Sequence, residues 1–148
     1  MVYQNAASFN REQNHPLQKT YTKKGRVSRM FSAIFSILMG AAMIAQWAFF
    51  LISGNVPEVK SEPVRVSLHL AAEGITALLL VISGIGLITF SPWSVPLALI
   101  AHGMLIYTVI QSPGYFAQKR VWPLVGMFAV FLVLTLVSMT LLFNAFSL

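Results

Sequence analysis

Four long apolar stretches, separated by short polar ones, organise the chain. They cover residues 30–53, about 67–90, 95–111 and 122–146. Each has at least the roughly 17 residues with which an α-helix can cross the ~30 Å hydrocarbon core of a bilayer. The pattern therefore predicts an all-α integral membrane protein, a four-transmembrane-helix bundle with up-down-up-down connections.

The polar stretches predict a tail and a loop. Residues 1–29 are rich in Asn, Gln, Ser, Lys and Arg, and no apolar helical period is sustained there, which predicts a mobile basic tail preceding a transmembrane domain over 30–148. The run GNVPEVKSEPVRV at 54–66 carries two prolines and predicts a loop too short to be a domain.

Two turns are predicted inside the transmembrane domain. SPWS at 91–94 indicates a tight turn with a tryptophan at the membrane interface. SPGY at 112–115 predicts a second turn, because Pro113 presets φ and Gly114 tolerates the positive φ of a type II turn.

Composition supports the membrane assignment and limits the chemistry. Apolar residues make up 57% of the chain and charged residues 9%, against about 25% charged in typical soluble domains. Cysteine is absent, which excludes disulfides, thiolate catalysis and Cys-ligated metals. With few other candidate ligands, we expect no metal site and no cofactor.

The net charge of +6 is concentrated near one end. A basic cluster next to an apolar span is typical of a topology signal and of attraction to a lipid bilayer rather than of nucleic-acid binding. Because basic residues favour the cytoplasmic side, we expect both termini to be cytoplasmic. The six basic residues are Arg11, Lys19, Lys23, Lys24, Arg26 and Arg29.

Small residues recur every four positions in the first span. They form one narrow helix face along which a second helix can approach closely, so they predict helix packing rather than a site. They are Ser32, Ser36 and Gly40.

The second span contains a carboxylate, Glu73, with His69 one turn before it. Glu73 lies six residues, or about 9 Å, past Ser67 and therefore inside the hydrocarbon. A charge at the bilayer centre costs about 2.5–3.5 kcal/mol on insertion scales, so the side chain should face the bundle interior. Burial there favours the uncharged carboxylic acid.

Counting residues from the predicted turns places other polar groups at the depth of Glu73. Folding the second and third spans about Pro92 brings Gln111 level with Glu73, and folding the first two spans brings Gln46 and Trp47 there. We therefore predict a polar layer that binds a ligand or a proton. Its members are Glu73, His69, Gln46, Trp47, Tyr107, Gln111 and Tyr115.

Simpler roles remain open for these residues. Glu73 is either a functional acid or a hydrogen-bonding contact that holds helices together. His69 is expected to be an interface residue or a partner of Glu73 rather than a metal ligand, and the aromatic residues serve as anchors or as a ligand cage. His102 is expected to hydrogen-bond a hydroxyl such as that of Thr135.

Three functions are compatible with the sequence. The first is a small membrane protein whose polar pocket around Glu73 binds a small or lipidic ligand or relays a proton or cation. The second is a non-catalytic accessory or assembly subunit of a larger membrane complex. The third is an intramembrane enzyme acting on a lipid or quinone, but no catalytic motif is present, which favours a non-enzyme. Four spans enclose little interior, so we also expect a homo-oligomer or a larger complex.

Overall fold

The computed structural model describes the backbone of residues 2–54 and 62–146, and within these the side chains outside 2–22, 24, 115 and 145–146. It contains four long helices, and no strand occurs in these ranges. The helices are α1 (Val2–Ile52), α3 (Pro63–Ile88), α4 (Ser94–Gln118) and α5 (Trp122–Phe146). The predicted all-α four-helix bundle is thereby confirmed.

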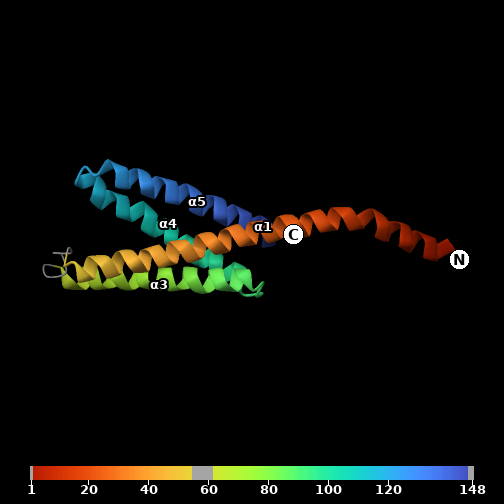
Figure 1. Cartoon of the computed structure of the whole chain (residues 1–148), viewed down its shortest axis with the longest axis horizontal. Coiled ribbons are helices and arrows are strands. Elements are labelled where there is room, and N and C mark those ends of the chain that lie inside the picture. Colours follow the sequence, from red (N-terminus) through yellow and green to blue (C-terminus); the bar gives the residue numbers. More distant parts are fainter. Residues whose placement is uncertain (1, 55–61, 147–148) are drawn as a thin grey trace.

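Each helix contains a window long and apolar enough to cross a bilayer, which makes the chain a multi-pass integral membrane protein. The windows are Gly25–Ile52, Pro63–Ile88, Ser94–Gln118 and Trp122–Asn144. In Figure 1 the part of α1 before this window extends past the other helices, which places the polar tail outside the bundle. The helical backbone of that segment was not indicated by its sequence pattern.

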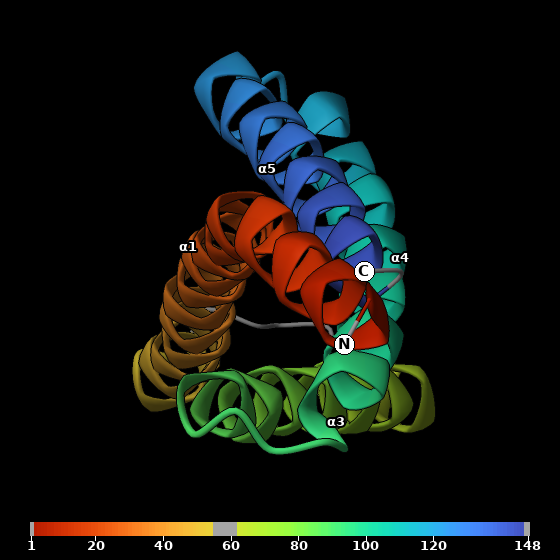
Figure 2. The ribbon, with the colours of Figure 1, turned by 90° about the vertical axis from the view of Figure 1, so that its right-hand side faces the viewer.

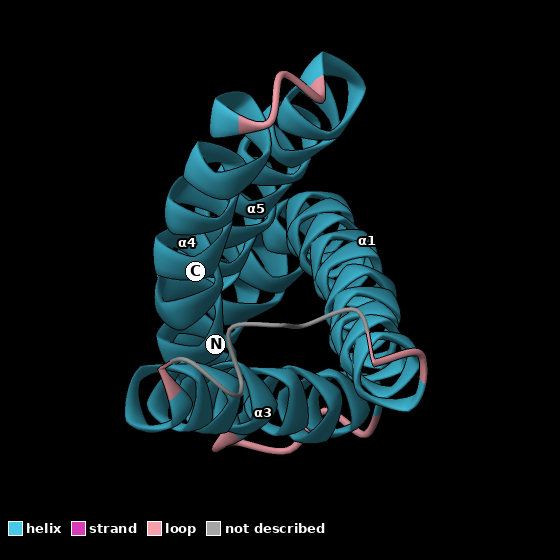
Figure 3. Ribbon diagram, turned by 90° about the vertical axis from the view of Figure 1, so that its left-hand side faces the viewer, coloured by secondary structure: helices cyan, strands magenta, loops and turns pink. Residues whose placement is uncertain are grey.

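The helices pack in a ring, with α1 against α3 and α5, and α4 against the same two helices. Figures 2 and 3 show this ring from its two ends. In Figure 1, α1 and α3 lie side by side, whereas the α4–α5 pair is inclined to them. The two pairs therefore diverge from the α3–α4 turn towards the opposite end of the bundle.

Glycines allow α1 and α3 to approach closely. An ideal Cβ on Gly40 would lie 2.6 Å from the carbonyl oxygen of Ala77, and one on Gly84 would lie 2.9 Å from that of Ala33. Neither distance is compatible with a real side chain, so only glycine permits this spacing. The predicted packing face is buried at all three of its positions, Ser32, Ser36 and Gly40.

Two of the helices end in Schellman caps that lack glycine. After α3, Phe90 takes a φ of 54°, its N–H donates to the Leu87 carbonyl, and the Ser91 N–H donates to that of Gly86. Arg120, with a φ of 57°, ends α4 in the same way. A left-handed conformation costs a non-glycine residue roughly 1–2 kcal/mol, so both positions store strain.

The prediction of a turn at 112–115 is wrong, because α4 continues through Pro113 to Gln118. Pro113 has no N–H, so the carbonyl of Val109 lacks the donor that a helix normally supplies at that position. Membrane helices tolerate such a proline more readily than helices in water, since neighbouring groups can satisfy the freed carbonyl. The connection to α5 lies instead at 119–121.

A buried hydrogen-bonded group joins α4, α5 and α1 near the middle of the bundle. The His102 Nδ1 lies 2.7 Å from the Ala98 carbonyl oxygen and its Nε2 lies 2.9 Å from the Ser138 Oγ. The Ser32 hydroxyl in turn donates to the Ser138 carbonyl at 3.4 Å. The expected packing role of His102 is thus present, although its hydroxyl partner is Ser138, one turn beyond Thr135.

Candidate functional site

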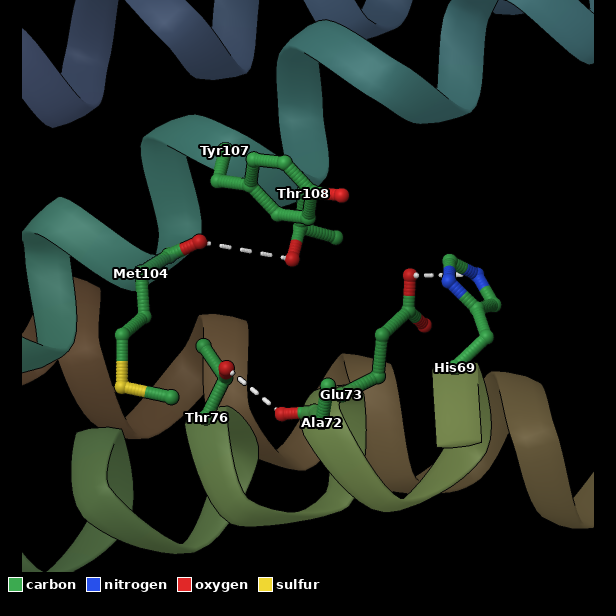
Figure 4. A pocket seen from close by; sticks show the side chains of 7 residues that line it. All are labelled: His69, Ala72, Glu73, Thr76, Met104, Tyr107 and Thr108. Atoms are coloured by element: carbon green, nitrogen blue, oxygen red, sulfur yellow. Dashed lines mark hydrogen bonds and ion pairs between the residues drawn. The ribbon is translucent and has the colours of Figure 1, made fainter. Parts of the chain in front are cut away.

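Glu73 lies on the face of α3 that points into the bundle. It follows Pro63, the first residue of α3, by ten residues, so it lies about 15 Å along the 26-residue helix. Only 7% of the residue is exposed. The bundle therefore shelters the acid from the lipid, where a charge at this depth would be costly. Figure 4 shows its side chain extending from α3 into the space between α3 and α4.

Two donors hold the carboxylate. The indole Nε1–H of Trp47 on α1 donates to Oε2. The His69 Nε2, one turn earlier on α3, lies 3.2 Å from Oε1, and it donates to this oxygen when the acid is ionised. The Trp47 and His69 rings meet edge to face at 5.8 Å, which orients both donors towards the same acid.

A cleft of about 140 Å³ adjoins the carboxylate between α3 and α4. We call it the Glu73 cleft, and its lining consists of His69, Ala72, Glu73, Thr76, Met104, Tyr107 and Thr108. The Thr76 hydroxyl donates to the Ala72 carbonyl at 2.8 Å and the Thr108 hydroxyl to that of Met104 at 3.4 Å. Figure 4 shows both interactions on the facing walls.

The arrangement offers hydrogen-bond acceptors between largely apolar walls. An ionised carboxylate has about four lone-pair positions, of which Trp47 and His69 occupy two. Because both threonine hydroxyls already donate to carbonyls, their oxygens can also accept. The cleft is therefore suited to a hydrogen-bond donor or a cation whose apolar part lies against α4.

The structure brings together three of the predicted site residues, Glu73, His69 and Trp47. Tyr107 also lines the cleft, at its rim, with 64% of the residue exposed.

Two further members of the predicted layer do not line the Glu73 cleft. Gln46 and Gln111 are exposed and do not belong to the lining of the Glu73 cleft. The side chain of Tyr115 lies outside the described residues.

Met104 and Thr108 line the α4 wall and were missed by the sequence argument. They are four residues apart, so they occupy one helix face, and a threonine in an apolar span was the available signal. Depth counting assigned α4 residues to the level of Glu73 without fixing the rotation of the helix, which decides which of them face it.

Metal ligation finds no geometric support in the described part of the chain. No three His, Asp or Glu side chains gather there around a common point. The pair formed by His69 and Glu73 is instead an acid and a base in contact.

No curated protein and no solved structure matches the chain. A family model does match, over residues 27–147, and this range contains all four membrane windows except the first two residues of the window in α1. The chain therefore belongs to the family described as Domain of unknown function (DUF8058).

Proposed function

We propose that the protein binds the polar head of a small amphipathic molecule in the Glu73 cleft, with binding linked to protonation of the acid. The observation that carries this proposal is a sheltered carboxylate with spare acceptor positions beside a cleft of about 140 Å³. At about 30 Å³ per water molecule, that volume corresponds to four or five waters, enough for an amine or hydroxyl head group.

The apolar part of such a ligand has a place beside the cleft. Met104 contributes an adaptable apolar wall, and Tyr107 at the rim offers an aromatic face. A cationic head gains most, because it meets the carboxylate in a region of low dielectric.

His69 supplies the link to protons. Its side chain is 36% exposed, whereas that of Glu73 is 8% exposed, so the histidine is the more accessible of the two from outside the bundle. An imidazole can take up or release a proton near neutral pH. We propose that His69 carries protons to and from Glu73 as a ligand leaves or enters.

Dodecylamine, dodecanol and dodecanoate serve as probes of one chain length with different heads. The readout is the fluorescence of Trp47 in a Trp93→Phe/Trp122→Phe background, titrated over a range of pH. We expect the amine to bind more tightly than the carboxylate, and Glu73→Gln to remove this preference and its pH dependence.

The matched control is Glu62→Gln, which removes the exposed carboxylate paired with Arg65 at 2.7 Å on the same helix. This variant should bind like the wild type. Equal binding of all three probes, or an unchanged amine preference in Glu73→Gln, would overturn the proposal.

A second candidate is an accessory subunit of a larger membrane complex or of a homo-oligomer. It is favoured by α5, of whose membrane window 17% is buried, against 44% for α3 and α4. Mass measurement after purification in mild detergent tests it. A stoichiometric foreign subunit supports the accessory role, and a monomer contradicts both forms of assembly.

We further propose that both termini are cytoplasmic. Six basic residues precede the apolar part of α1, whereas the polar stretches after the first and third spans of the sequence carry four, Lys60, Arg65, Lys119 and Arg120. Because the chain has no cysteine, single substitutions such as Ser53→Cys and Thr89→Cys report sidedness cleanly. In intact cells, an impermeant maleimide should label the first and not the second.

A further inference from the structure

Two arginines of α1 converge on one aromatic ring at the end of the bundle opposite the Glu73 cleft. The guanidinium carbon of Arg26 lies 6.0 Å from the centroid of the Phe90 ring, and that of Arg29 lies 5.9 Å from it. The two residues are three positions apart, so they share one face of α1. Phe90 belongs to the α3–α4 turn, so this contact brings two segments distant in sequence together.

The backbone of the turn fixes the ring below the arginines. Phe90 occupies the left-handed position of the cap that ends α3, where glycine would be unstrained. The residue is 47% exposed, so the strain is not offset by burial in the core. An aromatic ring held in this way can position guanidinium groups through cation–π contacts, but it cannot neutralise their charge.

No carboxylate compensates this pair within the described part of the chain. Two acids have described side chains: Glu62 immediately precedes α3, and Glu73 lies in the first half of this helix. Phe90 follows the other end of α3. The described ion pairs involve Arg65 and His69 and neither of the two arginines. Two positive charges near one ring, with no described carboxylate paired with them, favour an anion from outside the chain.

The depth of the arginines identifies the kind of anion. The window Gly25–Ile52 has 28 residues and is about 42 Å long, some 12 Å longer than the ~30 Å hydrocarbon core. Centring the helix leaves about 6 Å, or four residues, at each end in the head-group layer. Arg26 then lies among the head groups, and Arg29 lies at the boundary of the hydrocarbon.

We infer that Arg26, Arg29 and Phe90 form a binding site for the phosphate of an anionic glycerophospholipid. Planar guanidinium groups bind phosphate oxygens in a bidentate fashion, which lysine cannot do. The exposed Phe90 ring provides an apolar surface for the glycerol and upper acyl region. This site is independent of the Glu73 cleft and of the ligand proposed there.

Native mass spectrometry of the purified full chain tests the inference. Dioleoylphosphatidylglycerol and dioleoylphosphatidylcholine are added separately, and a third sample receives inorganic phosphate together with the anionic lipid. We expect one molecule of the anionic lipid to be retained in preference to the zwitterionic one. Arg26→Gln/Arg29→Gln should lower this affinity about 100-fold, because it removes two charge-assisted guanidinium–phosphate contacts.

Two further variants separate a built site from general attraction. Lys23→Gln/Lys24→Gln removes the same charge from the same segment and should lower the affinity far less. Arg26→Lys/Arg29→Lys keeps the charge but loses the planar fork, so its affinity should fall between those of the wild type and the glutamine variant. It also provides a test if the glutamine variant fails to fold.

Three results would overturn the inference: equal losses in the glutamine variants of the arginine and the lysine pairs, wild-type affinity in the lysine replacement, or equal retention of both lipids. Displacement of the anionic lipid by inorganic phosphate at comparable concentration would assign the site to free phosphate instead.

Discussion

Replacing Trp47 by phenylalanine isolates the hydrogen bond on which the Glu73 site depends. The substitution removes the Nε1–H that donates to Oε2 of Glu73, while an aromatic ring remains beside His69. It therefore deletes a donor across the α1–α3 contact and leaves the acid buried. The expected effect is a loss of stability together with a less firmly held carboxylate.

The magnitude follows from two bounds. A hydrogen bond to a charged group contributes about 1.5–3 kcal/mol, whereas polar contacts between membrane helices average about 0.6 kcal/mol and reach about 1.7 kcal/mol. Because Glu73 is only 7% exposed, water can replace the lost donor only in part. We expect Trp47→Phe to lower the free energy of unfolding by about 1–2 kcal/mol, a factor of roughly 5–30 in the unfolding constant.

Steric-trap unfolding in bicelles measures this free energy in a lipid environment. The same substitution in a Glu73→Gln background should cost about 1 kcal/mol less than in the wild type, because a neutral amide oxygen is a weaker acceptor. Trp122→Phe is the matched control, since Trp122 is 64% exposed. A coupling between Trp47 and Glu73 below about 0.3 kcal/mol, the level at which independent sites add, would refute the reasoning.

Further predictions concern packing and helix ends. His102→Ala removes a fully buried imidazole with two hydrogen bonds and should cost about 2–4 kcal/mol in the same unfolding assay. Gly40→Ala places a methyl group 2.6 Å from the Ala77 carbonyl oxygen and should cost about 1–3 kcal/mol. Gly103→Ala meets nothing within 4 Å and should stabilise by about 0.5–1 kcal/mol. Arg120→Gly relieves a φ of 57° and should stabilise the protein by up to about 1 kcal/mol, seen as a higher thermal unfolding midpoint.

The expected changes in stability differ in sign: two of these substitutions should destabilise the protein and two should stabilise it. If the two glycine substitutions had equal effects, the close α1–α3 approach would not limit the size of the residue at position 40. A destabilised Arg120→Gly would mean that the arginine side chain contributes more than its backbone strain costs. Wild-type stability in His102→Ala would contradict the role of the buried hydrogen-bonded group in joining α4 to α5.

The four spans were predictable because long apolar runs have one structural solution in a bilayer. The fourth predicted span coincides with α5, whose flanking tryptophan marks its start. The end of α4 was not predictable from turn chemistry, because the rule that places Pro113 in a turn applies to chains that water can solvate.

Counting residues from the turns predicted which groups lie at the depth of Glu73, but not how each helix is rotated about its axis. It placed Trp47 level with Glu73, and the two side chains are in contact. It could not distinguish Gln111, which is exposed, from Thr108, which lines the cleft, since both lie near the same height on α4. Helix rotation depends on packing details, such as the glycine contacts, that no single span encodes.

The contact between Trp47 and Glu73 has a consequence for biosynthesis. During translation α1 leaves the ribosome before α3. The Trp47 indole, which donates to the Glu73 carboxylate, is therefore already in the bilayer when Glu73 is inserted. The first helical hairpin thus needs no later segment to accommodate its least lipid-soluble residue. Insertion of α3 without α1 should accordingly fail more often than insertion of the pair. Replacing Glu73 by a neutral residue should remove this difference in insertion efficiency.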